Sequence, residues 1–144
     1  MEDSMKSYAI TILQGINPED RLSADSVFTR MLVRALQTKN SFYYPFDSLI
    51  TISKLVPPDS SFRIFTWQLF INDNLVRKHG AIQMNTPDGS LKLFPLIDKA
   101  PNMENQKTEI GDNFNWVGSV YYRIVQKESF GKKYYTLLGY DEND

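Results

Sequence analysis

The stretch Phe62-Arg63-Ile64-Phe65-Thr66-Trp67-Gln68-Leu69-Phe70-Ile71 is the longest β-favouring run in the chain. Along a strand, side chains alternate between its two faces. One face would carry Phe65, Trp67, Leu69 and Ile71. The other face would carry the apolar residues Phe62, Ile64 and Phe70. Because both faces are apolar, we predict a central strand with other elements packed on each side.

The composition predicts one globular domain over residues 1–144. The chain has 144 residues, of which 42% are hydrophobic and 23% are charged, and this is enough to form one core. With a net charge of -1, it lacks the basic stripe of a nucleic-acid binder. The absence of cysteine excludes disulfides and thiolate chemistry. No run reaches the roughly 18 apolar residues that span a bilayer.

Two amphipathic helices are predicted before the central strand. Over residues 3–15, apolar side chains recur at helical spacing, and Asn17-Pro18 then interrupts the pattern. A second helix is predicted over residues 23–38, with Ser23 as its N-cap. The first helix could present its apolar stripe to a partner, but packing on its own domain is favoured.

The segment between the second helix and the central strand has two parts. Residues 41–46 (Ser-Phe-Tyr-Tyr-Pro-Phe) form an aromatic connector, which could offer a stacking platform but more often fastens a helix to a sheet. For residues 47–56 we predict a short helix, because Asp47-Ser48 provides a capping signal. The β-branched residues of this segment also fit a strand.

Strands dominate the rest of the chain. Beyond the central strand, the pattern predicts strands over residues 75–85, 91–97, 116–126 and 132–140. Thr86-Pro87-Asp88-Gly89-Ser90 is a strong turn signal, whereas residues 98–115 form a long polar loop of the kind that is functional or mobile. We therefore expect an α+β fold, mainly helical over 1–56 and mainly β over 62–140, with a mainly antiparallel meander of about five strands.

The residues that could carry catalysis are few. His79 is the only histidine, and a Ser-His-Asp triad would need it with Asp88 or Asp98 as its orienting acid. No serine lies in a Gly-x-Ser-x-Gly elbow, so a packing or surface role for His79 is favoured. Carboxylates of Asp88, Asp98 or Asp112 could serve a hydrolase. No phosphate loop, dinucleotide fingerprint or calcium loop is present, and we expect neither cofactor nor metal.

Aromatic residues near the end of the chain are the candidate ligand-binding residues. We single out Trp116, Tyr122, Tyr140 and the neighbouring Asp141. Aromatic faces exposed beside the long loop could bind a glycan or a peptide. Ordinary cross-strand aromatic pairing is the competing interpretation.

Two groups of motifs carry a resemblance. The first is Ser41-Phe42, Tyr44-Pro45-Phe46-Asp47-Ser48-Leu49, Ile52-Ser53-Lys54-Leu55, Pro58-Asp59 and Phe62-Arg63-Ile64-Phe65-Thr66-Trp67. The second is Trp116, Tyr121-Tyr122, Tyr134-Tyr135-Thr136-Leu137 and Gly139-Tyr140-Asp141 with Asn143. Across most of the chain after the first helix, these motifs resemble a family of uncharacterised proteins from Bacteroidetes-type bacteria.

The resemblance implies an exported protein of the periplasm or cell envelope. It also implies that further strands follow the last motif, so this chain could be one part of a longer protein. The sequence shows no signal peptide, and the resemblance supplies no activity or site residue. We therefore expect a non-catalytic binding or structural module of the bacterial cell envelope, with a carboxylate-dependent hydrolase as the alternative. The last strand could alternatively pair with another chain or with a continuation of its own.

Overall fold

The computed structural model describes residues 2–72, 75–96, 120–129 and 131–140, with side chains described for only part of the last two ranges. The helical elements are α1 (Glu2–Gln14), α2 (Pro18–Leu36) and the 3-10 helix η1 (Ser41–Tyr43). The strands are β1 (Ser53–Leu55), β2 (Phe62–Asn72), β3 (Leu75–Met84), β4 (Leu93–Leu96), β5 (Val120–Ser129) and β6 (Lys132–Tyr140). The predicted α+β class is confirmed.

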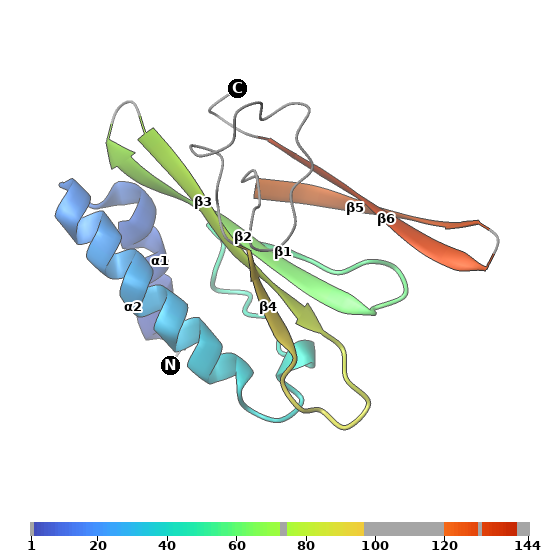
Figure 1. Cartoon of the computed structure of the whole chain (residues 1–144). Coiled ribbons are helices and arrows are strands. Elements are labelled where there is room, and N and C mark those ends of the chain that lie inside the picture. The colour runs from blue at the N-terminus through green and yellow to red at the C-terminus, as the bar shows by residue number, and fades with distance from the viewer. Residues whose placement is uncertain (1, 73–74, 97–119, 130, 141–144) are drawn as a thin grey trace.

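The strands form two antiparallel sheets. The first has the order β1-β2-β3-β4, so β2 has a strand on each edge, of which only β3 was predicted, and the second is the β5-β6 hairpin. Strands that are neighbours in sequence are neighbours in each sheet, but the expected single meander is divided in two. Figure 1 shows α1 and α2 on one face of the larger sheet and the hairpin on the other side.

Both faces of β2 are buried, and each belongs to a different cluster. On the helix side, Phe65 and Trp67 pack with side chains from α1 and α2, and the Phe28 and Trp67 rings meet edge to face at 5.2 Å. On the opposite side, Ile64 packs with Leu96 and with partly buried side chains that include Ile124 and Leu137 of the hairpin. Both faces of β2 are therefore apolar because other elements pack on each of them, as the sequence predicts.

Helix α2 begins at Pro18, earlier than the predicted start at Ser23. The Asn17 side chain accepts a hydrogen bond from the Asp20 backbone N–H at 2.9 Å. Proline is well suited to the first turn because the N–H that it lacks would have no helical partner there. Asn17-Pro18 thus interrupts one helix and also starts the next, and the proposed cap at Ser23 is wrong.

The helix predicted over residues 47–56 is also wrong. Turns lead into the short strand β1, which pairs with β2 so that Lys54 lies opposite Phe65. The Lys54 ammonium donates hydrogen bonds to the carbonyls of Leu49 and Ile52, which completes the turn without a helix. The β-branched content of the segment was the better guide here, because the free edge of β2 offers a strand partner.

The predicted turn between β3 and β4 is present. The Asp88 carboxylate accepts hydrogen bonds from the backbone N–H and hydroxyl of Ser90, at 3.0 and 2.6 Å. Gly89 has φ of 75°, and its carbonyl accepts a hydrogen bond from the Asn40 N–H at 3.2 Å. The turn therefore contacts the start of the aromatic connector. None of the described helices is long and apolar enough to cross a membrane.

Replacing Phe28 by alanine should lower the free energy of unfolding by about 3–5 kcal/mol, because the ring is fully buried against Trp67. Leu22→Ala, at a position on the same helix that is 42% exposed, should cost less than about 1 kcal/mol. Urea unfolding measures both values. Equal losses in the two variants would contradict the described packing of α2.

Candidate functional site

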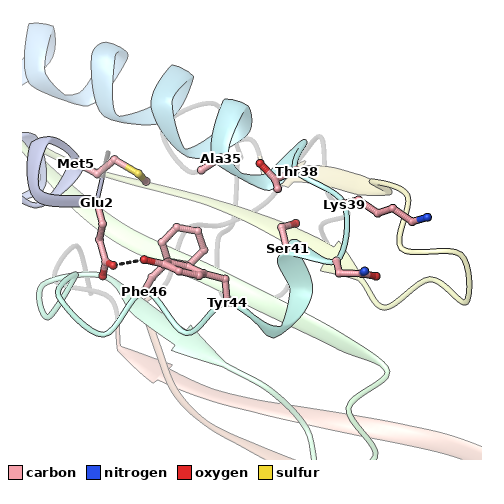
Figure 2. A pocket seen from close by; sticks show the side chains of 9 residues that line it. Glu2, Met5, Ala35, Thr38, Lys39, Ser41, Tyr44 and Phe46 are labelled. Atoms are coloured by element: carbon pink, nitrogen blue, oxygen red, sulfur yellow. Dashed lines mark hydrogen bonds between the residues drawn. The ribbon is translucent and has the colours of Figure 1, made fainter.

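A pocket of about 310 Å³ lies where α1 begins, where α2 ends and where the aromatic connector passes. Its lining residues are Glu2, Met5, Ala35, Thr38, Lys39, Asn40, Ser41, Tyr44 and Phe46 (Figure 2). Met5 and Phe46 are buried and give the pocket an apolar wall. The Tyr44 ring meets the Phe46 ring edge to face at 4.6 Å. Large, rigid aromatic surfaces of this kind are typical of small-molecule sites.

A carboxylate stands at one end of this pocket. The Tyr44 hydroxyl donates a hydrogen bond to Glu2 Oε1 at 2.5 Å, and the Ser48 backbone N–H donates to Glu2 Oε2 at 2.8 Å (Figure 2). The Tyr44 hydroxyl, followed by the Ser48 N–H, lowers the pKa of Glu2 below its ordinary value. The same hydrogen bond raises the pKa of Tyr44. Glu2 is therefore ionised at neutral pH, and its oxygens can accept further hydrogen bonds.

The buried Arg63 fixes the connector that forms one wall of the pocket. The side chain is 4% exposed. It donates to the carbonyls of Tyr44 and Ser41 at 2.5 and 3.0 Å and to Gln83 Oε1 at 2.8 Å. Its guanidinium also lies over the Phe65 ring, 4.7 Å from the centroid. Burial lowers the pKa of Arg63 to about 10, so the group stays charged at neutral pH.

The Arg63 network extends to the end of α2. Gln83 lies opposite Arg63 in the β2-β3 pair, and its Nε2 donates to Ser41 Oγ at 2.9 Å. Ser41 Oγ donates in turn to the carbonyl of Leu36 at 2.7 Å. One continuous chain of hydrogen bonds thus joins the sheet, the connector and the last turn of α2. The aromatic connector therefore fastens α2 to the sheet, which is the role that the sequence favours for it.

A second polar cluster lies on the same face of the sheet, around His79. His79 Nδ1 lies 2.9 Å from Asp25 Oδ2. Trp67 Nε1 donates to Asp25 Oδ1 at 2.8 Å. Asp25 is 7% exposed, and it comes from the middle of α2 rather than from the turn or loop that a triad with Asp88 or Asp98 would use. Among the described residues, the hydrogen bonds of His79 go to Asp25 alone, which fits the packing role.

The predicted ligand-binding residues are described only in part. Trp116 and Asp141 lie outside the described residues. Tyr122 lies in β5 where the register shifts, and Tyr140 ends β6 opposite Val120, but only their backbone positions are described. The role of these residues as a glycan or peptide platform therefore stays a prediction.

Of the three carboxylates considered for a hydrolase, only that of Asp88 lies within the described residues. Asp98 and Asp112 lie outside the described residues. The Asp88 carboxylate is exposed, and the hydroxyl of Ser90, followed by its N–H, lowers the pKa of Asp88. It therefore acts as an acceptor within its own turn. Within the described ranges, no three histidine, cysteine, aspartate or glutamate side chains gather as a metal site.

Sequence reasoning found one wall of the pocket and missed the rest. The connector stood out because it is rich in aromatic residues, and Tyr44 belongs to it. Glu2 comes from the first turn of α1, and no spacing in the sequence connects it with Tyr44. The hydrophobic residue Met5 looked only like part of the helical stripe. Tertiary packing alone brings these three side chains to one pocket.

Comparisons with known proteins identify no family for this chain. No family model matches the chain, and no curated protein or solved structure matches it at a significant level. The resemblance of the sequence motifs therefore stays a prediction. The function proposed below is based on the geometry of this chain.

Asp25→Ala should lower the free energy of unfolding by about 2 kcal/mol, because it leaves the buried Trp67 N–H without its acceptor. Asp25→Asn is the matched control: its amide oxygen can still accept from Trp67, so the loss should be clearly smaller. Chemical unfolding at neutral pH compares the two. Equal losses would show that the acceptor is not what stabilises this cluster.

Tyr44→Phe should return the pKa of Glu2 toward its ordinary value, because it removes the first cause of the lowering. An acid with a lowered folded-state pKa adds stability above its unfolded pKa and loses it as the pH falls through the folded value. The variant should thus be less stable than the parent at neutral pH, and the difference should fade in acid.

Carboxyl NMR titration of Glu2 measures the first effect, and unfolding at two pH values measures the second. Tyr8→Phe, an exposed tyrosine on the same helix, is the control and should leave the Glu2 titration unchanged. An unaltered titration in Tyr44→Phe would contradict the described contact.

Proposed function

We propose that the protein is a non-catalytic binding module that holds a small amphipathic molecule in the Glu2–Tyr44 pocket. The observation that carries this proposal is a pocket of about 310 Å³ with a mainly apolar wall and one ionised carboxylate at its end. Small-molecule sites are commonly about 300–1,000 Å³ in volume, with apolar walls and a few placed polar groups.

The chemistry of the lining suggests which end of a ligand goes where. Glu2 is an acceptor, and Figure 2 shows it at the opposite end of the pocket from Lys39. The apolar surfaces of Met5, Ala35 and Phe46 lie between these ends. A ligand with an amine or amide head at Glu2 and an apolar body along the pocket would match both features.

Two polar groups of the pocket, the Glu2 carboxylate and the Ser41 hydroxyl, make structural hydrogen bonds, which favours binding over catalysis. Glu2 is held by Tyr44 and Ser48. The Ser41 hydroxyl is held between Leu36 and Gln83. A catalytic nucleophile needs an adjacent base, and the hydrogen bonds of Ser41 reach none. No observation on the described residues favours the carboxylate hydrolase.

Two further features of the sequence hypothesis remain proposals. A bacterial cell-envelope location follows from the motif resemblance, and cell fractionation of the native source would test it. Binding of a glycan or peptide by Trp116, Tyr122, Tyr140 and Asp141 needs a separate test, because the described lining of the Glu2–Tyr44 pocket consists of other residues.

Ala35→Phe should abolish binding of hexylamine, because the added ring fills the pocket that Ala35 lines. Glu2→Gln should weaken hexylamine binding by about threefold to tenfold while changing hexanol binding little, since only the amine loses a charge-assisted hydrogen bond. Isothermal titration calorimetry of both ligands against the parent and the variants gives these ratios.

The control is Arg34→Phe, which adds the same ring at an exposed neighbouring position of α2. It should bind hexylamine like the parent. The proposal fails if the parent shows no saturable hexylamine binding, or if Ala35→Phe binds as tightly as the parent does.

A further inference from the structure

A second hollow lies on the other side of the aromatic connector and is independent of the Glu2–Tyr44 pocket. It has a volume of about 410 Å³ and is lined by Phe42, Tyr43, Pro45, Asp47, Lys54, Val56, Ser60 and Arg63. The two cavities share no lining residue. The connector is the wall between them, and different residues of it line each side.

Two cations line this hollow, and their hydrogen bonds go to neutral acceptors. The Lys54 ammonium donates to the carbonyls of Leu49 and Ile52. The Arg63 guanidinium donates to two backbone carbonyls and to the side-chain amide of Gln83. No carboxylate neutralises either cation through a hydrogen bond among the described residues. Their positive charge is therefore available to attract an anion.

The positive charges of Lys54 and Arg63 are close enough to affect each other. Burial lowers the pKa of Lys54, and the neighbouring charge of Arg63 lowers it further. The carboxylates of Asp47 and Glu2 oppose this change, but burial is the largest cause. Asp47 is the only acid among the described residues of the lining. Within the lining itself, two cations face one exposed anion, and the Glu2 carboxylate that also acts on Lys54 lies outside the lining.

Each cation also keeps a donor for a further acceptor. An ammonium has three N–H groups and a guanidinium has five. Lys54 uses two of its N–H groups, and Arg63 uses four through Nε, Nη1 and Nη2. One N–H on each side chain is thus uncommitted to the described residues. A carboxylate has two oxygens and could accept from both.

The rim of the hollow offers apolar surface beside these donors. The apolar side chain of Val56 is 45% exposed, and the largely apolar ring of Tyr43 is 71% exposed. The Tyr43 hydroxyl accepts a hydrogen bond from Asn85 Nδ2 at 3.2 Å, which holds the ring in position. Exposed apolar surface next to a polar recess is characteristic of a binding site.

We propose that this hollow binds a small organic carboxylate. The carboxylate accepts the remaining N–H groups of Lys54 and Arg63, and the apolar body of the molecule lies against Tyr43 and Val56. The proposal does not depend on a ligand in the Glu2–Tyr44 pocket, because the two cavities are separate.

The test is a titration of the ¹⁵N-labelled protein with sodium benzoate, followed by the backbone amide signals of Phe42, Tyr43, Asp47, Lys54 and Val56, which belong to the hollow and not to the Glu2–Tyr44 pocket. Benzoate should shift these signals saturably. Benzyl alcohol, which keeps the ring but lacks the negative charge, should bind at least about tenfold more weakly. Inorganic phosphate, which has the charge but no apolar body, should also bind more weakly than benzoate.

Variants locate the binding. Lys54→Met should weaken benzoate binding about tenfold, whereas Lys54→Arg, which keeps the charge, should retain most of it. Val56→Asp places a negative charge at the exposed rim and should weaken binding by a similar factor even if Lys54→Met does not fold. Lys39→Met and Ala35→Phe alter only the Glu2–Tyr44 pocket and should leave benzoate binding unchanged.

The proposal is overturned if benzoate causes no saturable shift, if benzyl alcohol or phosphate binds as tightly as benzoate, or if Val56→Asp binds like the parent. Because Ala35→Phe should abolish hexylamine binding and spare benzoate binding, failure of one site is distinguishable from failure of the other.

Discussion

The buried Arg63 guanidinium is the constraint on which the path of the aromatic connector and both cavities beside it depend. It lies at the start of the central strand, yet its hydrogen bonds reach the connector at the Tyr44 and Ser41 carbonyls. Aromatic rings of Phe42, Phe46 and Phe65 surround its charge within about 6 Å. A buried charge is costly unless such contacts replace water, so this position strongly restrains the path of the connector.

Because Arg63 fixes the connector, it also shapes the cavities on both sides. The carboxylate end of one cavity and the cationic recess of the other are separated by residues 42–46 of the same segment. The two sites therefore complement different ligand charges while depending on one support. The His79–Asp25–Trp67 cluster, farther along the same strands, instead fastens α2 to the sheet.

The sequence was most informative where a pattern is local. The alternating apolar residues of β2, the helical stripes and the Asp88-Gly89 turn each depend on neighbours in the chain, and all are present in the structure. The ends of the helices were less predictable. The dipeptide Asn17-Pro18 can end one helix or begin the next, and the sequence alone does not show that it does both. The helix predicted over residues 47–56 is absent because pairing with β2 overrode the capping signal at Asp47.

The candidate sites were not predictable because their chemistry is assembled across long sequence separations. Glu2 meets Tyr44, and Arg63 meets Gln83, only through the packing of α1 and β3. The local signals at these positions indicated no more than a helix start and a strand. Aromatic content did point to the connector, but not to the charged groups that give each cavity its preference.

Amide hydrogen exchange of Arg63→Met tests the central claim most directly. If Arg63 holds the connector, the amides of residues 42–46 should exchange much faster in the variant, while the buried amides of α2 and β3 keep most of their protection. Lys92→Met, at an exposed cation whose ammonium lies over the Phe94 ring, should leave the connector unchanged. Connector amides that stay as protected in Arg63→Met as in the parent would contradict this view of the molecule.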